Sequence, residues 1–410
     1  CIPVCISGVA KPMQSFGVLI FGRALSGVGE ASFQCIAPAF IQDYAPQGQQ
    51  VLYLGIFFSS ITVGTAGGYA YSAIISTSES YGWSWAFYLE GLMMAPFVFI
   101  CWLLPYRLQH DGSEVDVEDR GEKSKSQAGQ SRGMSLWTEV HTIMNNNLFI
   151  VISLGYAAYC AVLAGLSTFG PTFFQGLQLF NDEKSASLHF SAIVGLAGLI
   201  GTPVGGYLSD KLAGGNASRA DVLKTCLRIM SVSSTFGLIF AIAAAYCRER
   251  YTFLGFMGTA IMMLFLPTGC CTMAVMEAVP TEMRASAVAL NILIMHILGD
   301  VPSPVAVGAL KDWLAPHCNT KTIGGQEVLN PECVEDEHGL RLTLVICLGW
   351  LAWTVFFWTL PLVFPEACGQ PATLDENQLE ESKPLLNVTA ADSDKQAMGL
   401  GSRKGTDSEI

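Results

Sequence analysis

Charged residues are scarce in this sequence. Only 14% of its 410 residues are Asp, Glu, Lys or Arg, whereas a soluble globular domain usually carries about a quarter. Hydrophobic residues make up 51% of the chain, and the mean hydropathy is +0.42. These values exclude an ordinary soluble domain and indicate a protein that lies mostly in lipid.

The sequence also lacks the motifs of an enzyme or a nucleic-acid-binding protein. It has no Ser/His/Asp arrangement, no cysteine or histidine spacing of a zinc site and no basic stripe interleaved with aromatic residues. The glycines of TVGTAGGYA are not followed by the lysine of a P-loop, so they are typical of helix packing. We expect no enzymatic activity, no metal, no cofactor and no nucleic-acid partner.

Long apolar blocks recur along the chain, each of about 20–26 residues, which is the length that a helix needs to cross a bilayer core. A signal peptide is not evident, and the first ten residues look like the end of a helix whose beginning is missing. The sequence predicts an all-α membrane protein. After that partial span, nine full spans are predicted at 16–41, 51–76, 83–104, 148–170, 189–212, 225–247, 252–276, 285–309 and 340–364.

Two polar segments divide the chain into four parts. Residues 1–105 carry the first spans, and residues 106–147 form a polar central loop. Residues 148–365 carry six further spans. The tail, residues 366–410, has too few apolar residues to bury a core, so we expect it to be disordered.

Lysine and arginine in the shorter loops predict the orientation of the spans. The 106–147 and 211–224 loops carry most of this positive charge and fall on the same side, which is therefore predicted to be cytoplasmic. The 310–339 loop falls on the opposite face. Arg248 and Arg250 lie on that face too, so the charge rule holds imperfectly.

Arg23 and Glu30 lie inside one span, in the stretch FGRALSGVGEASF. Each charge at the centre of a span costs roughly 2.5–3.5 kcal/mol on insertion scales. Their spacing of seven residues is two helical turns, which places both on one helix face. We favour a proton- or substrate-linked site in a central cavity over the alternative, a structural ion pair with another helix.

His296 and Asp300 form a second candidate pair, in NILIMHILGDVPSP. They are four residues apart and so share a helix face, and imidazole titrates near neutrality, which suits a proton relay. Pro302 and Pro304 are expected to kink the helix. An equally good interpretation is that Asp300 caps or pairs near the outer surface.

Glu90 is a further candidate for the substrate or proton pathway. It follows the aromatic stretch WSWAFYLE, whose Trp83 and Trp85 are typical of an interfacial belt. Because Glu90 lies about two turns further into the span, it is a candidate for a polar-facing position. A structural role is the more frequent outcome for such a residue.

The stretch GGYLSDKLAG, which contains Gly206, Asp210 and Lys211, lies at the cytoplasmic end of a span. Small residues permit close helix packing, and a carboxylate can accept hydrogen bonds from the N-terminus of a neighbouring helix. We predict that this motif holds one state of a moving pair of helices. Glu277 and Arg284, which flank a turn at Pro280, are interpreted as structural.

Two features lie outside the spans. Cys318 and Cys333 share the 310–339 loop on the non-cytoplasmic face, where oxidation is allowed, so a disulfide is favoured over free thiols. In the tail, Glu381, Leu385 and Leu386 have the form of an acidic dileucine sorting signal, read by an adaptor for endosomes and lysosomes. Such short patterns also recur by chance.

These motifs resemble the major facilitator superfamily and, within it, the Spinster-like branch. FGRALSGVGEASF is similar to that family's fourth-helix motif, and GGYLSDKLAG is similar to the second-half copy of the superfamily loop motif. VPTEMRASAVALNILIMHILGDVPSP is similar to the Spinster segment that joins the tenth and eleventh helices, including its HxxGDxxSP core. The resemblance runs from the third helix to the twelfth and leaves out the central loop and the tail.

The resemblance implies a two-bundle helical architecture with about ten of twelve helices present. The first two helices are lacking, and with them the first-helix acid that the family uses in proton coupling. The resemblance also implies alternating access about a midplane site. In that mechanism Arg23 holds an anionic headgroup or pairs with Glu30, Glu30 is the protonatable switch, and His296 and Asp300 line the second half of the pathway.

The implied activity is proton-linked transport of a lysolipid or sphingoid-type lipid across an endolysosomal or plasma membrane. Partners would be the lipid substrate, protons, membrane lipids and a sorting adaptor. One alternative is a carrier of a soluble organic anion such as a sugar phosphate, and another is a transport-inactive membrane interaction protein if the first two helices are truly absent. A lipid carrier needs an apolar flank beside the charge, for which Phe57, Phe58 and Met94 are candidates.

Overall fold

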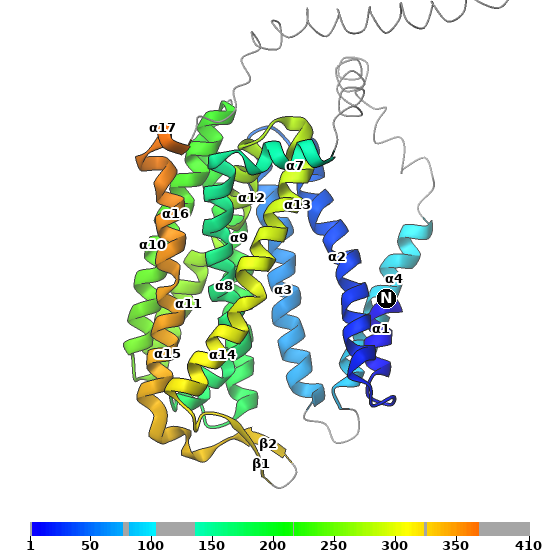
Figure 1. Cartoon of the computed structure of the whole chain (residues 1–410), viewed down its shortest axis with the longest axis vertical. Helices are drawn as coiled ribbons and strands as arrows, with labels where there is room; N and C mark the ends of the chain where they lie inside the picture. The colour runs from blue at the N-terminus through cyan, green and yellow to red at the C-terminus, as the bar shows by residue number, and fades with distance from the viewer. Residues whose placement is uncertain (1, 77–81, 104–135, 216, 324–325, 369–410) are drawn as a thin grey trace, which may run out of the picture. The chain divides into compact units, whose positions relative to one another are not determined.

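Long helices make up most of the chain in the computed structural model, which describes residues 2–76, 82–103, 136–215, 217–323 and 326–368 (Figure 1). The first part of the chain forms α1 (Ile2–Val9), α2 (Phe16–Tyr44), α3 (Gln50–Ser76) and α4 (Ser84–Leu103). The second part forms α7 (Leu136–Met144), α8 (Asn147–Gly176), α9 (Glu183–Ala213), α10 (Arg219–Tyr246), α11 (Arg250–Phe265), α12 (Thr268–Glu277), α13 (Arg284–Met295), α14 (Pro302–Leu314), α15 (Glu337–Gly349), α16 (Leu351–Val363) and α17 (Pro365–Cys368).

Within the described residues, seven helices or runs of helices are long and apolar enough to cross a membrane. They are Gln50–Gly68, Asn147–Gly176, Glu183–Ala213, Arg219–Tyr246, Arg250–Glu277, Thr281–Leu314 and Pro331–Val363, with Ser84–Ile100 as a shorter apolar helix. The 29-residue α2 is long enough to cross but carries charged residues. The prediction of an all-α, multi-pass membrane protein is confirmed.

Capping residues begin several of these helices. Asn146 accepts a hydrogen bond from Phe149 N at the start of α8, and Asp182 accepts one from Ser185 N at the start of α9. Ser218 caps α10 in the same way. Because the first N–H groups of a helix have no partner inside it, these side chains fix where each helix begins.

The core of the second part lies between α8, α10, α12 and α16. Trp358 of α16 is fully buried and donates its indole N–H to Ile152 O of α8 at 3.2 Å. Tyr159 of α8 donates its hydroxyl to Leu264 O of α11 at 2.8 Å. Helix α12 is buried from Gly269 to its end, so its side chains pack on all sides against neighbouring helices.

Two predicted spans are interrupted. The 252–276 span breaks at Pro267, between α11 and α12, because proline lacks the N–H that continues the helix ladder. The 285–309 span contains a π-helical turn, η4 (His296–Asp300), in which Val301 N donates to His296 O. Single π-turns inside α-helices are frequent at functional sites.

The structure also has elements in segments expected to be loops. Helix α7 lies at the end of the predicted 106–147 loop. In the 310–339 segment, β1 (Thr320–Ile323) and β2 (Gln326–Leu329) pair as an antiparallel hairpin, followed by a 3₁₀ helix, η5 (Pro331–Asp336). A second 3₁₀ turn, η3 (Thr281–Met283), precedes α13.

Candidate functional site

Helices α3 and α9 pack closely along a seam of small residues. A β-carbon placed on Gly198 of α9 would lie 2.2 Å from Thr62 Oγ1 of α3. One placed on Gly55 of α3 would lie 2.4 Å from Thr202 O of α9. Because neither position has room for a side chain, glycine lets the two helices approach this closely.

At the predicted cytoplasmic end of this seam, Asp210 caps the N-terminus of α3. Its carboxylate accepts hydrogen bonds from Leu52 N at 2.8 Å and from Val51 N at 3.3 Å. Gly206, one turn earlier on α9, faces Val51 O so closely that a β-carbon there would lie 2.4 Å from it. Lys211 turns away, with its ammonium 5.7 Å from the centre of the Tyr207 ring.

A second contact between the two parts of the chain centres on Glu277, at the end of α12. Its side chain is only 6% exposed and accepts hydrogen bonds from Gln42 Nε2 at 2.5 Å, Arg284 Nη2 at 2.9 Å and Arg219 Nε. One carboxylate therefore joins α2, α10, α12 and α13. Asp43, beside Gln42, adds a 4.0 Å ion pair to Arg284 Nη1 at the rim.

We call Asp210 with the α3 N-terminus, together with Glu277 and its partners, the cytoplasmic latch. Both halves of the latch depend on polar contacts between the two parts of the chain. No pattern in the sequence indicates a latch role for Gln42, Asp43 or Arg219, because each is an ordinary polar residue near a helix end. Glu277 and Arg284, interpreted as structural from sequence, reach across to α2 in the structure.

Arg23 and Glu30 are both exposed on α2. No ion pair joins them within the part of the chain that the structure describes. Glu30 accepts a 2.8 Å hydrogen bond from Gln34 Nε2, one turn further along α2. The guanidinium carbon of Arg23 lies 6.0 Å from the centre of the Phe87 ring of α4.

Tyr71 of α3 and Glu90 of α4 lie near Arg23. The two charged groups lie within electrostatic reach of Tyr71, so polar residues of three helices are near one another here. Sequence reasoning named Glu90 but missed Tyr71 and Phe87. Tyrosine and phenylalanine in an apolar span give no signal of their own.

Aromatic side chains flank this polar region toward the predicted cytoplasmic end. The rings of Phe33 of α2 and Phe57 of α3 have centroids 5.5 Å apart, and Phe57 and Phe58 have centroids 5.2 Å apart. Met94 of α4, the third residue expected on an apolar flank, is 46% exposed. Phe33 is a member of this group that the sequence reasoning did not name.

His296 and Asp300 lie at the two ends of the π-turn η4. His296 Nδ1 and Asp300 Oδ2 are 2.9 Å apart, and both side chains remain partly exposed. Gly299 allows the turn to approach α8, because a β-carbon there would lie 2.5 Å from Ala157 O. Ser303, just after the turn, donates its hydroxyl to Ala161 O of α8.

Comparisons with known proteins agree with this arrangement. The model of the Major Facilitator Superfamily matches residues 1–302. The chain is 28% identical over 316 residues to the probable sphingolipid transporter spinster homolog 1 of Arabidopsis thaliana, covering 73% of this chain and 62% of that protein. The chain belongs to the Major Facilitator Superfamily.

Other comparisons show how much of each similar protein the chain covers. It is 26% identical over 377 residues to protein spinster homolog 1 of Homo sapiens, covering 88% of this chain and 66% of that protein. A crystal structure of a bacterial homologue of the human lysosomal transporter Spinster, inward-facing and occupied, shares its fold with a TM-score of 0.58 and 18% identity, covering 88% of this chain and 81% of that one. The chain spans 62%, 60% and 58% of the length of three Arabidopsis relatives.

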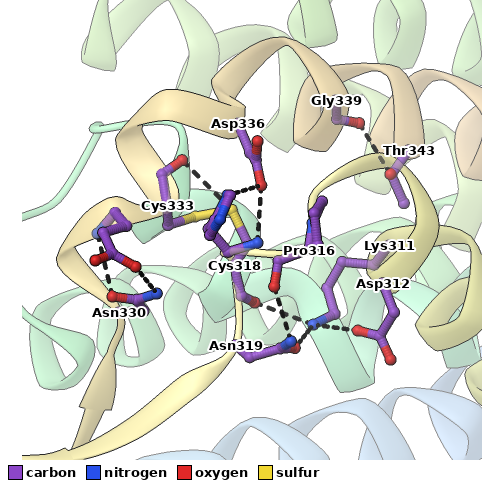
Figure 2. The surroundings of a disulfide bond; sticks show 12 residues. Lys311, Asp312, Pro316, Cys318, Asn319, Asn330, Cys333, Asp336, Gly339 and Thr343 are labelled. Carbon is purple, nitrogen blue, oxygen red and sulfur yellow. Dashed lines mark hydrogen bonds and ion pairs between the residues drawn. A yellow bond between two sulfur atoms is a disulfide. The ribbon is translucent and has the colours of Figure 1, made fainter.

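On the predicted non-cytoplasmic face, Cys318 and Cys333 form a disulfide that closes the hairpin loop (Figure 2). Lys311 of α14 is 6% exposed and donates to Cys318 O at 3.0 Å and to Asn319 Oδ1 at 2.5 Å. A buried lysine with these partners holds the loop against the end of α14. Sequence reasoning gave the cysteine pair but not the lysine.

Two predicted features are not placed by the structure. The sorting signal, Glu381 with Leu385 and Leu386, lies outside the described residues. Most of the 106–147 loop lies outside them as well. The structure therefore does not test these predictions.

Proposed function

We propose that this chain is a secondary active transporter of the Spinster type that works by alternating access. Its substrate is a lysolipid or sphingoid-type lipid, its movement is linked to protons, and its membrane is endolysosomal or plasma. A bacterial protein with the same fold is described as a homologue of a human lysosomal transporter, and plant relatives are named as probable sphingolipid transporters.

The observation that carries the proposal is that one helix, α2, bears both the candidate site and part of the latch. Arg23 and Glu30 lie along its middle, and Gln42 and Asp43 at its end bind Glu277 and Arg284. Helix α2 runs from Phe16 to Tyr44 without a break, with Pro38 between the two sites, so a shift that follows substrate binding near Arg23 can reach the latch along one helix. This coupling is what alternating access requires.

The latch is suited to act as a gate because its contacts are hydrogen bonds and ion pairs, and because the helices beside it meet at small residues. Breaking Asp210 from the α3 N-terminus and Gln42 from Glu277 would free one bundle from the other, while water replaces the lost hydrogen bonds. At the α3–α9 seam the glycines face a short threonine side chain and backbone atoms, so no long side chain has to be withdrawn there. The two bundles can then rock about the site between them.

A lipid is favoured over a soluble anion such as a sugar phosphate because the polar region has an apolar flank. Phe33, Phe57 and Phe58 form a connected aromatic group on α2 and α3. A sugar phosphate would leave that flank without a partner, whereas a lipid tail would cover it. Exclusion of water from an apolar surface is favourable by about 25 cal/mol for each Å².

Proton linkage is assigned to Glu30. Its carboxylate is exposed on α2 and bonded to Gln34, so it can lose or gain a proton without breaking an ion pair. The test is uptake of a radiolabelled lysolipid into proteoliposomes with an imposed pH gradient. We expect the Glu30→Gln variant to lose gradient-driven accumulation while Glu183→Gln, an exposed acid at the start of α9, behaves as wild type.

Each outcome separates the alternatives. No lysolipid uptake by the wild-type chain together with uptake of a sugar phosphate would favour the soluble-anion carrier. Uptake of neither compound would favour the transport-inactive interpretation. Wild-type flux with an unaltered pH profile in Glu30→Gln would remove Glu30 from the mechanism while leaving transport in place.

A further inference from the structure

Helix α10 exposes a single face, which combines two cations with a row of apolar side chains. From residue 223 to residue 246 the exposed residues are Lys224, Arg228, Val232, Phe236, Ile239 and Tyr246. They follow one another at helical spacings of three, four or seven residues, so all of them lie on one side of the helix. We call these six residues the outer face of α10. Because α10 is long and apolar enough to cross a membrane, this face meets lipid.

The length of the outer face fits a bilayer with Arg228 at its predicted cytoplasmic edge. Eighteen residues separate Arg228 from Tyr246, which is about 27 Å at 1.5 Å per residue. This is close to the thickness of a hydrocarbon core, about 30 Å, and tyrosine is typical of the opposite interface. Arg228 then lies at the boundary of the hydrocarbon, and Lys224, one turn nearer the water, lies in the headgroup layer.

The protein does not neutralise these two cations. No ion pair involves Lys224 or Arg228 within the part of the chain that the structure describes. Asp221, which comes before Lys224 on the same helix, instead accepts a 2.6 Å hydrogen bond from Ser218 Oγ at the helix start. Two positive charges that face lipid without a partner are complementary to an anionic headgroup.

Helix α16 packs beside α10 and presents further apolar side chains at the same depth (Figure 1). Ser231 Oγ of α10 and Thr359 Oγ1 of α16 are 2.5 Å apart, which fixes the register of the two antiparallel helices. In that register Arg228 lies level with the end of α16, where Val363 and Phe364 are 59% and 57% exposed. Both helices therefore present apolar surface at the level of the guanidinium.

We infer that the outer face of α10 is a binding site for an anionic phospholipid of the cytoplasmic leaflet. The guanidinium of Arg228 binds the phosphate, since its N–H groups match two phosphate oxygens at once. Lys224 attracts the net negative charge from within the headgroup layer. The acyl chains run along Val232, Phe236 and Ile239. This lipid is a bound component of the protein on its outer surface, and the site does not depend on what the chain transports.

The position of Lys224 gives the site its selectivity. In phosphatidylcholine the choline extends beyond the phosphate toward the water, where it meets the ammonium of Lys224 and is repelled. Phosphatidylglycerol has an uncharged glycerol in that place and keeps a net negative charge. Each basic residue near an anionic lipid surface contributes about fivefold to the affinity. The pair should therefore favour phosphatidylglycerol by about 25-fold.

The test titrates the purified full chain in detergent micelles with dioleoyl phosphatidylglycerol or dioleoyl phosphatidylcholine. For each lipid, the mole fraction that gives half of the maximal rise in unfolding temperature is measured. Lys224→Gln and Arg228→Gln should each lower the preference for phosphatidylglycerol about fivefold, whereas Arg228→Lys should keep most of it because the charge remains. Arg248→Gln changes an exposed arginine just past the opposite end of α10 and should keep the wild-type preference.

The possible results decide for or against the site. An equal response of the wild-type chain to both lipids would show that no anionic lipid site exists. An unchanged preference in both Lys224→Gln and Arg228→Gln, or an equal loss in Arg248→Gln, would place the bound lipid elsewhere and overturn the inference. Stabilisation by inorganic phosphate alone, equal to that by phosphatidylglycerol, would show a free-anion site instead. Lys224→Gln changes only an exposed side chain, so it keeps the test decisive even if Arg228→Gln does not fold.

Discussion

The carboxylate of Asp210 accepts a 2.8 Å hydrogen bond from the backbone N–H of Leu52. These residues lie 158 positions apart, at the end of α9 and the beginning of α3. The bond satisfies an N–H that α3 itself cannot pair, and it places a negative charge at the positive end of the helix. The close packing of α3 and α9 therefore ends in a polar contact that can open.

Removing this contact should open the predicted cytoplasmic end. Asp210→Ala loses hydrogen bonds to a charged acceptor, each worth about 1.5–3 kcal/mol, so the balance between closed and open states should move at least tenfold toward the open one. Thr62, which is buried in the seam, can report this as Thr62→Cys. Its labelling by a membrane-impermeant maleimide should become faster in Asp210→Ala.

The control for that experiment is Asp221→Ala. Asp221 lies in the first turn of α10 and is exposed; within the described residues its side-chain hydrogen-bond partner is Ser218, so it does not join α3 to α9. Labelling of Thr62→Cys should keep the wild-type rate there. An equal rate in Asp210→Ala and Asp221→Ala would contradict the role of Asp210 in the latch.

Two glycines of α3 allow a matched test of the seam. A β-carbon at Gly55 would lie 2.4 Å from Thr202 O, whereas one at Gly64 would have no atom within 4 Å. Gly55→Ala should lower the free energy of unfolding by about 1–3 kcal/mol, since the clash is with backbone. Gly64→Ala should raise it by up to about 1 kcal/mol, because alanine favours helix. Unfolding in an SDS titration measures both, and changes of the same sign would show that the seam is loose.

Removing the Glu277 side chain should lower the free energy of unfolding more than removing any other single side chain of the latch. Glu277→Ala leaves Arg284, whose side chain is 14% exposed, with only the 4.0 Å ion pair to Asp43 at the rim. Breaking a buried ion pair in this way costs about 3–5 kcal/mol. The double variant Glu277→Ala/Arg284→Ala removes both charges and should recover part of that loss.

A double-mutant cycle on these two residues gives the coupling energy directly. We expect a coupling of at least about 1 kcal/mol in the free energy of unfolding, measured by SDS titration. Additive losses from Glu277→Ala and Arg284→Ala would mean that the two residues act independently, contrary to the 2.9 Å bond between them.

The sequence predicts the helices well because each span is decided locally, by about 20 apolar residues in a row. The span predicted at 51–76 is α3, and that at 189–212 lies within α9. Helix α7 was not predicted because its nine residues lie in a polar segment. The hairpin was not predicted because its strands have only four residues each, too few to give an alternating pattern.

The site could be predicted only in part, since partners come from distant positions. The place of Asp210 at a helix end indicated that it would accept from a neighbouring helix, but not that the neighbour would be α3. Gln42 and Glu277 are 235 residues apart, and no spacing rule relates them. The seven-residue spacing of Arg23 and Glu30 predicts a shared helix face, but no spacing within α2 could indicate that Arg23 lies over Phe87 of α4.

The disulfide between Cys318 and Cys333 closes a loop with a sequence separation of 15 residues. Constraining a loop of that size stabilises the folded state by about 3 kcal/mol in the chain-entropy model. Cys318→Ser/Cys333→Ser should therefore unfold at a lower temperature than wild type under non-reducing conditions. Adding a reductant should lower the unfolding temperature of the wild-type chain and leave the double variant unchanged.

Lys311 provides a second way to loosen the same loop without touching the sulfur atoms (Figure 2). Lys311→Met keeps the apolar stem but removes the hydrogen bonds to Cys318 O and Asn319 Oδ1. Because these acceptors then lose a charged donor, the loop should be cut faster by a protease while the disulfide stays intact. If Lys311→Met is as resistant as wild type and the serine double variant is not, the disulfide alone holds the loop in place.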